Sequence, residues 1–85
     1  MDISYSPSFV KQYKKLPPLL QEEVLEKVEL FKDTKNHSLL KVHLLHGKLS
    51  GYYSFSVNYV YRVLFEKVKN KEVSLLKIGD HSIYQ

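Results

Sequence analysis

The stretch GYYSFSVNYVYRVLF, residues 51–65, has the alternating pattern of a β-hairpin. Every second position on both sides of its centre is apolar or aromatic, and these positions are Tyr53, Phe55, Val57, Tyr61, Val63 and Phe65. Alternate side chains of a strand point to opposite faces of a sheet. A three-residue loop at 58–60 would pair Val57 with Tyr61 and place the whole set on one face. The opposite face would then carry two serines and Arg62.

Charge singles out the same region. Of the 13 lysine and arginine residues, Arg62 is the only arginine, and its place on the polar face makes it the strongest single site candidate. Positive and negative residues balance in 1–40, so the whole net charge of +4 falls in 41–85. Such an excess suits a negatively charged partner, either nucleic acid or an acidic protein segment. A soluble basic surface without a dedicated partner would have the same charge.

Length and composition indicate one domain that spans residues 1–85. The hydrophobic share of 44%, which includes 7 tyrosines and 4 phenylalanines, is sufficient for a packed core. The sequence has no cysteine, which excludes disulfides and thiolate metal sites. Because it has neither a signal-peptide pattern nor an apolar run of membrane-spanning length, we expect a cytoplasmic protein with no membrane partner.

Two helices are predicted before the hairpin, after a short strand at 1–5. Ser6 and Pro7 form an N-cap followed by a proline in the first turn. The pair Pro17-Pro18 ends this helix and begins the next. The buried stripe of the second helix consists of Leu20, Val24, Val28 and Phe31.

After the hairpin, residues 73–78 predict a last strand and 80–85 a short polar tail. Residues 35–50 are harder to assign, and we expect a loop there with one short turn or strand. The order β-α-α-β-β-β predicts an α+β fold, in which a helical hairpin packs on one face of a small antiparallel sheet. The helices would cover the Tyr53 face and leave the Arg62 face at least partly open.

The open face is where we expect a functional site. If the last strand pairs with the second hairpin strand, Arg62, Lys77 and His81 could share that face. Arginine offers a planar fork of donors to a phosphate, and histidine exchanges a proton near neutral pH. With the hydroxyl of Tyr84, this set suits phosphodiester cleavage, in which a base takes a 2′-OH proton and a cation stabilises the phosphorane. The alternative is a surface arginine and a histidine in a frayed tail.

The histidines His43 and His46 have the spacing HxxH, which could place two imidazoles on one metal ion. No cysteine or suitably spaced carboxylate completes such a site, so we expect neither a metal nor another cofactor. A solvated or structural pair is the alternative, and either histidine could also line an RNA-facing cleft.

Aromatic and basic residues elsewhere could contact nucleic acid. Tyr52 and Tyr59 could stack on bases, whereas the tyrosines of the apolar set fall on the core face. The lysine-rich run at 67–71 is either a solvated turn or a contact to a nucleic-acid backbone.

Two runs of sequence carry a resemblance to a known family. They are KVHLLHGKLSGYYSFSVNYVYRVLFE, residues 41–66, and VSLLKIGDHSIY, residues 73–84. The most specific pieces are Leu49-Ser50-Gly51, Tyr61-Arg62-Val63 and the terminal GDHxxY from Gly79 to Tyr84. Together with the helical hairpin, nearly the whole chain resembles the RelE/ParE superfamily of toxins from bacterial type II toxin–antitoxin operons. Within it, the chain looks most like the RelE-like mRNA interferases.

The resemblance implies a RelE-like fold and a ribosome-dependent endoribonuclease that cuts mRNA in the A site of the 30S subunit without a metal. It also implies a cognate acidic antitoxin as partner. By match of motif, Arg62 corresponds to an arginine that stabilises the phosphate, and His81 to a residue of acid/base or charge stabilisation. Tyr84 corresponds to an aromatic residue that positions the substrate. We expect further substrate contacts from His46, Lys48, Lys77 and Tyr52.

The chain also departs from the family pattern. Ser54 and Ser56 stand in the strand where relatives carry basic residues or a histidine, so the identity of the general base stays open. The same fold includes ParE-type toxins that inhibit DNA gyrase without cutting RNA. An inactive relative that only binds an antitoxin is a further alternative. The pair of His81 and Tyr84 favours the nuclease.

Overall fold

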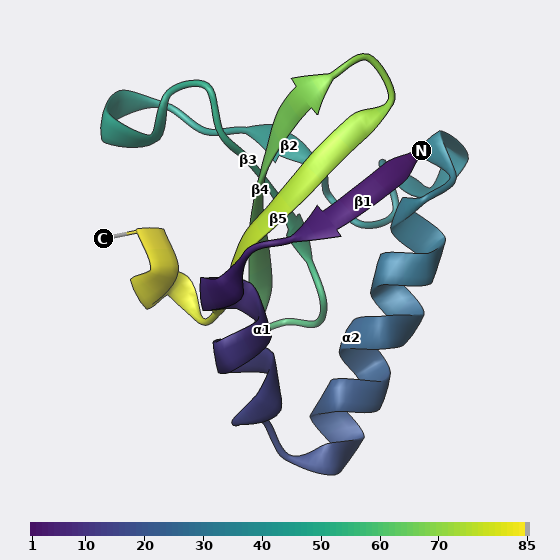
Figure 1. The fold of residues 1–85 in the computed structure, drawn as a ribbon, viewed down its shortest axis with the longest axis vertical. Helices are drawn as coiled ribbons and strands as arrows, with labels where there is room; N and C mark the ends of the chain where they lie inside the picture. The colour runs from purple at the N-terminus through teal and green to yellow at the C-terminus, as the bar shows by residue number, and fades with distance from the viewer. Residues whose placement is uncertain (85) are drawn as a thin grey trace.

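The structure is a computed structural model that describes residues 1–84, in which a five-stranded sheet carries two helices on one face (Figure 1). The helices are α1 (Pro7–Lys14) and α2 (Pro18–Phe31), and the strands are β1 (Asp2–Tyr5), β2 (His43–Leu44), β3 (Tyr53–Ser56), β4 (Arg62–Lys69) and β5 (Glu72–Gly79). Short 3-10 helices are η1 (Thr34–Asn36), η2 (Gly47–Leu49) and η3 (His81–Tyr84). The strand order is β1-β5-β4-β3-β2. The predicted α+β class, with a helical hairpin on the sheet, is confirmed.

The two helices begin where the prolines predict. Ser6 caps α1, because its Oγ accepts a hydrogen bond from the Phe9 N–H at 3.0 Å. The same hydroxyl donates to the carbonyl of Leu76 in β5 at 2.7 Å, which ties the cap to the sheet. The Gln21 side-chain amide donates to the carbonyl of Leu16 at 3.1 Å and closes the turn between the helices. In the part of the chain that the structure describes, neither helix has the length and apolarity needed to cross a membrane.

The hairpin of β3 and β4 has the predicted register. The N–H of Val57 donates to the carbonyl of Tyr61 at 2.9 Å, which closes the three-residue loop. Across the two strands Phe55 pairs with Val63, and both are buried in the core. Arg62 therefore lies on the opposite face of the sheet, as the alternation predicts.

Three details differ from the sequence predictions. The sheet is mixed rather than antiparallel, because the edge strand β1 runs parallel to its neighbour β5. The predicted polar tail folds as η3 against the Arg62 face, and Gln85 lies outside the described residues. That face is also less open than expected, since Ser54 and Leu64 are buried on it. In 35–50, the expected short strand is β2, which pairs with β3.

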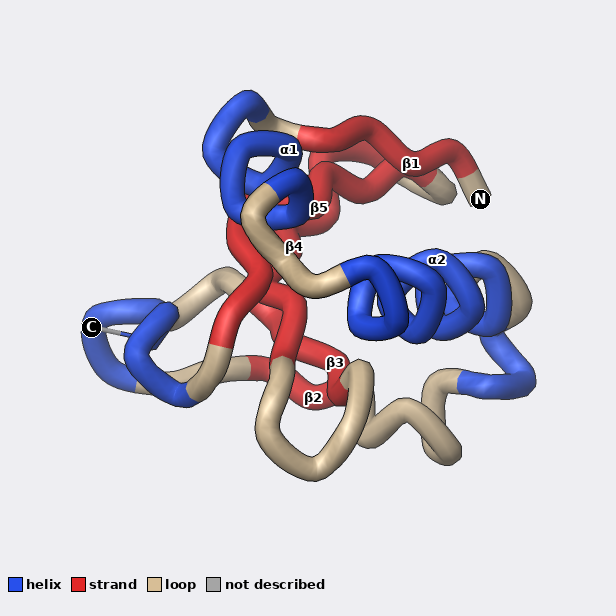
Figure 2. The backbone as a smooth tube through the Cα atoms, turned by 90° about the horizontal axis from the view of Figure 1, so that it is seen from below, coloured by secondary structure: helices blue, strands red, loops and turns tan. Residues whose placement is uncertain are grey.

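Phe31, the last residue of α2, is central to the core. Its ring stacks on Phe55 with centroids 4.5 Å apart and on His37 at 4.8 Å, and it meets Phe65 edge-on at 4.8 Å. Phe31 is fully buried. In Figure 2, α2 lies on one side of the strands and the C-terminal segment on the other. Phe31 thus joins the helical layer to the two hairpin strands.

Truncation of this ring should destabilise the whole domain. We expect Phe31→Ala to lower the free energy of unfolding by about 3–5 kcal/mol, because it removes the apolar contact and leaves a cavity between the layers. Urea denaturation measures the change. Leu25→Ala, at a side chain of α2 that is 55% exposed, is the control and should shift the value by less than about 0.5 kcal/mol. Equal effects of the two substitutions would contradict the central position of Phe31.

Candidate functional site

Arg62 is oriented by the loop that precedes it. Its Nη1 donates to the carbonyl oxygens of Asn58 at 2.7 Å, of Tyr59 at 3.3 Å and of Tyr61 at 3.3 Å. These are the only hydrogen bonds of its side chain within residues 1–84, so the N–H donors of Nε and Nη2 remain for another partner. A half-buried guanidinium that is fixed on one side and open on the other is suited to bind an anion.

The loop itself is anchored through Asn58. The side-chain Oδ1 of Asn58 accepts hydrogen bonds from the N–H groups of Val60 at 2.9 Å and Tyr61 at 2.8 Å. Its Nδ2 donates to the carboxylate of Glu23 in α2 at 2.7 Å. The loop is therefore tied to itself and to the helical layer, and the carbonyls that orient Arg62 are held in place.

The 3-10 helix η3 packs close to the end of β5. Hydrogen bonds from the side chain and the N–H of Ser82 hold the pKa of Asp80 below its usual range, and the N–H bond to Oδ1 measures 2.9 Å. Ile83 is buried, and a Cβ added at Gly79 would lie only 2.6 Å from its Cγ2. The missing side chain of Gly79 therefore permits η3 to approach the sheet and to place Tyr84 on the Arg62 face.

Tyr84, Ser54 and His43 form a hydrogen-bonded chain across this face. The Tyr84 hydroxyl donates to Ser54 Oγ at 3.1 Å, and this Oγ lies 3.5 Å from Nε2 of His43. The Nδ1 of His43 lies 2.8 Å from the carbonyl oxygen of Lys41 and donates its proton there, because a carbonyl only accepts. Nε2 is then the basic nitrogen, directed at the Ser54 hydroxyl. Ser54 is fully buried, whereas His43 is exposed.

His81 links this chain to the Arg62 side of the face. Its ring meets the Tyr84 ring edge-on with centroids 5.9 Å apart. With Arg62, it also lines a groove of about 750 Å³. Lys77 is half-buried and lies on the same face, because it pairs with Leu64 of β4, two residues from Arg62. The structure thus places Arg62, His81, Tyr84 and Lys77 on one face of the sheet.

The other residues selected from the sequence lie apart from this cluster. His46 and Lys48 are exposed in the connection between β2 and β3, at η2. Tyr52 is half-buried just before β3, where its carbonyl accepts a hydrogen bond from the Leu45 N–H at 2.9 Å. No hydrogen bond or ring contact within residues 1–84 joins these three residues to Arg62, His81 or Tyr84.

Sequence reasoning did not predict that His43 lies on the Arg62 face. The HxxH spacing directed attention to metal binding, but in residues 1–84 no three histidine or carboxylate side chains gather as ligands. The usable signal is the pairing of His43 with Ser54 across β2 and β3, which puts both on the Arg62 face. Since β2 has only two residues, periodicity could not predict that pairing.

No protein-family model and no curated protein matches the sequence, whereas the structure matches solved toxins. The YoeB/ParE toxin from Agrobacterium tumefaciens has 18% identity and a TM-score of 0.76, over 95% of this chain and 99% of that one. The toxin in the complex RelBE2 from Mycobacterium tuberculosis has 22% identity and a TM-score of 0.74, over 94% and 96%. A conserved hypothetical protein from Helicobacter pylori has 28% identity and a TM-score of 0.65, over 96% of both chains.

The fold is that of the RelE/ParE toxins. The agreement extends over almost the full length of each chain, which confirms the RelE-like fold predicted from the sequence. In this RelE/ParE fold, the cluster around Arg62 occupies the sheet face opposite the helical hairpin.

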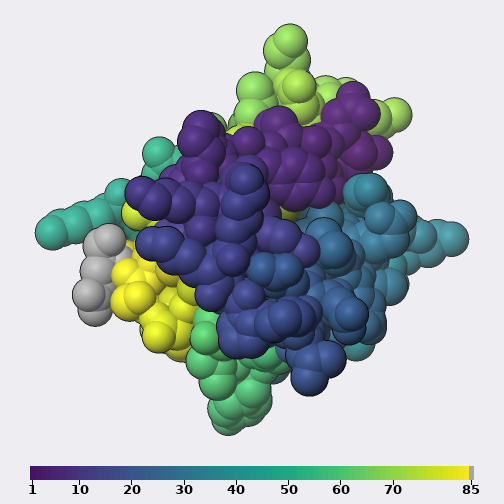
Figure 3. All heavy atoms as spheres, turned by 60° about the horizontal axis from the view of Figure 1, so that its bottom comes forward, coloured from purple at the N-terminus to yellow at the C-terminus, as the bar shows by residue number. Residues whose placement is uncertain are grey.

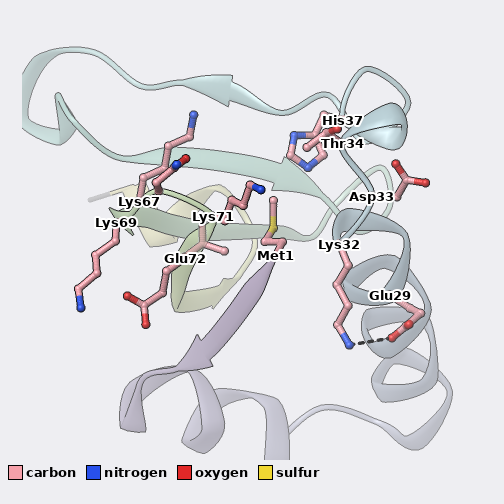
Figure 4. Close-up of a pocket in the computed structure, with 12 residues that line it drawn as sticks. Met1, Glu29, Lys32, Asp33, Thr34, His37, Lys67, Lys69, Lys71 and Glu72 are labelled. Atoms are coloured by element: carbon pink, nitrogen blue, oxygen red, sulfur yellow. Dashed lines mark hydrogen bonds and ion pairs between the residues drawn. The ribbon is translucent and has the colours of Figure 1, made fainter.

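A second hollow of the RelE/ParE fold, of about 770 Å³, lies at the far end of β4 (Figure 4). Lysines of the β4–β5 turn stand on one side of it, the end of α2 on the other, and Met1 between them. Its charges are mixed, because acidic side chains also line it and Lys32 pairs with Glu29 at 3.0 Å. Arg62 begins β4 and Lys69 ends it, so strand geometry separates this hollow from Arg62 by roughly 20 Å.

A side chain at residue 79 should displace η3. We expect Gly79→Ala to lower the free energy of unfolding by about 1–3 kcal/mol, because its Cβ overlaps Ile83. The Tyr84 ring signals in NMR spectra should shift as its hydroxyl leaves Ser54. In an Ile83→Ala background the same substitution should cost much less, since the overlapping methyl is gone. An equal cost in both backgrounds, measured by urea denaturation, would disprove the overlap.

Proposed function

We propose that this chain is the toxin of a type II toxin–antitoxin system, an endoribonuclease that cuts mRNA on the ribosome and so inhibits translation. The observation that carries the proposal is the placement of Arg62, His81 and Tyr84 on one face of a RelE/ParE fold. A phosphate ligand, a titratable imidazole and a phenol are the groups that attack by a ribose 2′-OH requires. A protein with this activity works in the cytoplasm, on translated mRNA.

Arg62 supplies the anion site. Attack of the 2′-OH on the adjacent phosphate adds negative charge to the phosphorane, and Nε and Nη2 of Arg62 can donate to two of its oxygens. Because Nη1 is already bound to the carbonyls of the loop, the guanidinium needs little reorganisation when the charge develops. Stabilisation by preorganised donors is a large contribution to catalysis.

The hydrogen-bonded chain supplies a base for the 2′-OH. Tyr84 Oη accepts the 2′-OH proton and passes its own proton to Ser54 Oγ. Ser54 in turn passes its proton to Nε2 of His43. Each hydroxyl gains one proton and loses one, so the positive charge appears only on the His43 imidazolium. The carbonyl of Lys41 accepts from its Nδ1 and stabilises that charge.

His81 supplies the acid. It is exposed, lines the groove with Arg62, and meets the Tyr84 ring edge-on. As an imidazolium it donates a proton to the leaving 5′ oxygen when the P–O bond breaks. The products are a 2′,3′-cyclic phosphate and a 5′-hydroxyl end. All groups needed for the step come from the chain itself.

The partner that controls the toxin is an acidic antitoxin. Among the solved relatives are toxin–antitoxin complexes, RelBE2 from Mycobacterium tuberculosis and YoeB–YefM from Staphylococcus aureus. In this chain the net charge of +4 falls entirely in residues 41–85, which include the Arg62 face. An acidic segment laid on that half would neutralise the same cations that hold RNA.

Loss of the anion ligand or the acid should abolish cutting. We expect Arg62→Ala and His81→Gln each to lower the rate of mRNA cleavage by about 10²–10³-fold, because each removes stabilisation of the transition state. Primer extension on mRNA in a reconstituted translation reaction detects the new 5′ ends. Lys15→Ala, at an exposed residue of the helical layer in the charge-balanced part of the chain, is the control and should cut as the unchanged protein does.

Other results would point to other functions. Cutting that persists in both variants would refute the assigned site. Intact mRNA together with inhibited DNA supercoiling would identify a ParE-type gyrase inhibitor. Intact mRNA and normal supercoiling, with tight binding of an antitoxin, would indicate a domain that only binds its partner.

The base and the acid can be told apart with a modified substrate. An mRNA with sulfur in place of the leaving 5′ oxygen needs no acid, because a thiolate leaves without protonation. We expect His81→Gln to cut this substrate at nearly the normal rate, while His43→Gln stays slower by about 10²-fold or more. Lys15→Ala, at an exposed residue of the helical layer, is the control and should cut both substrates at the normal rate. Rescue of His43→Gln by the sulfur substrate would reverse the two assignments.

A further inference from the structure

The groove beside Arg62 and His81 continues to an apolar wall. Its lining further includes Leu30 of α2, Leu39 and Leu40 of the segment before β2, and Tyr59 at the tip of the β3–β4 loop. The groove therefore combines cationic and apolar lining residues. A nucleotide has a matching combination, with an anionic phosphate and a base whose flat faces are apolar.

Tyr59 is 93% exposed, although the loop that carries it is held firmly. Asn58 binds two N–H groups of the loop and the carboxylate of Glu23, and Arg62 binds the Tyr59 carbonyl at 3.3 Å. Figure 3 shows the loop (green) protruding beside η3 (yellow). An aromatic ring on an anchored loop that contributes little to the core is available as a stacking surface.

We propose that Tyr59 forms the wall of a nucleobase subsite, on which the base next to the phosphate held by Arg62 stacks. This inference rests on the proposed function and adds to it a contact with a base. The guanidinium binds the carbonyl of Tyr59 itself, so the hydrogen-bonded loop positions both the phosphate ligand and the stacking ring. The subsite would select by stacking and groove shape, without reading hydrogen-bonding edges.

The charges of the groove favour a nucleotide over an aliphatic side chain of a protein. Lys27, Lys41, Arg62 and His81 line it, and the carboxylate that lines it, Glu26, already pairs with Lys27 at 3.9 Å. A phosphate on Arg62 neutralises part of this positive charge while its base covers Tyr59 and Leu39, which is 72% exposed. An aliphatic side chain would cover the same wall but leave the cations without a partner.

Binding of a non-cleavable RNA tests the subsite apart from catalysis. The probe is a 2′-O-methyl tetranucleotide added to the full protein, with NMR detection. We expect the Tyr59 ring protons to shift upfield under the ring current of the base, together with the Arg62 Nε–H signal. Tyr59→Ala should weaken binding about tenfold, and Tyr59→Phe should restore it. Val60→Ala alters the same loop at a residue outside the groove lining and should bind normally.

The outcomes separate this inference from the proposed function. Normal binding and cutting by Tyr59→Ala, with Arg62→Ala inactive, would overturn the subsite and leave the nuclease intact. Weaker antitoxin binding as the only defect of Tyr59→Ala would also overturn it, in favour of a protein contact. If the unchanged protein cuts no mRNA, the proposed function fails, while an upfield shift of Tyr59 with the tetranucleotide would still support the subsite.

Discussion

The hydrogen bond from the Val57 N–H to the Tyr61 carbonyl fixes the register of β3 against β4, and both faces of the sheet depend on that register. A shift of one residue would put Phe55 and Arg62 on the same face, so that either Phe55 would leave the core or Arg62 would enter it. An unpaired guanidinium under Phe31 would cost several kcal/mol, so the core itself opposes such a shift. The position of Arg62, the proposed anion ligand, is therefore set by the same contacts that build the core.

The second face of the sheet combines stability with chemistry. Ser54 is fully buried there, and an unsatisfied hydroxyl at such a position would be destabilising. Its bonds to Tyr84 and His43 satisfy it, and no buried side-chain polar atom of residues 1–84 lacks a partner. The chain proposed to carry the proton is thus also what makes a buried serine acceptable beneath η3. Gly79 has no side chain and therefore permits η3 to pack at this position. Both the burial of Ser54 and the proposed proton path depend on that packing.

The sequence predicted the elements whose signals are local. The N-cap at Ser6, the apolar stripe ending at Phe31 and the alternation around Phe55 each lie within a few residues, and the structure agrees with all three. Three features depend on contacts between distant parts of the chain: the parallel pairing of β1, the pairing of His43 with Ser54, and the hydrogen bond from Tyr84 to Ser54. Neither the hydrophobic periodicity of a segment nor a capping residue predicts such contacts. The alternation identified Arg62 and the hydroxyl made Tyr84 a candidate, whereas the substrate-positioning role of Tyr84 came from the resemblance to a family.

Arg62 binds the loop with one nitrogen and faces the groove with the others. The anchoring of the loop shows whether the loop orients the arginine or the arginine supports the loop. Asn58 already holds the loop through its bonds to two N–H groups and to Glu23. The Nη1 of Arg62 has two N–H groups for three carbonyl oxygens, so its bonds there are shared and individually weak. The loop therefore orients the arginine more than the arginine supports the loop. A side chain held in this way keeps its remaining donors directed at one point. An anion that binds there loses its own freedom of motion, but little further entropy is lost in ordering the arginine.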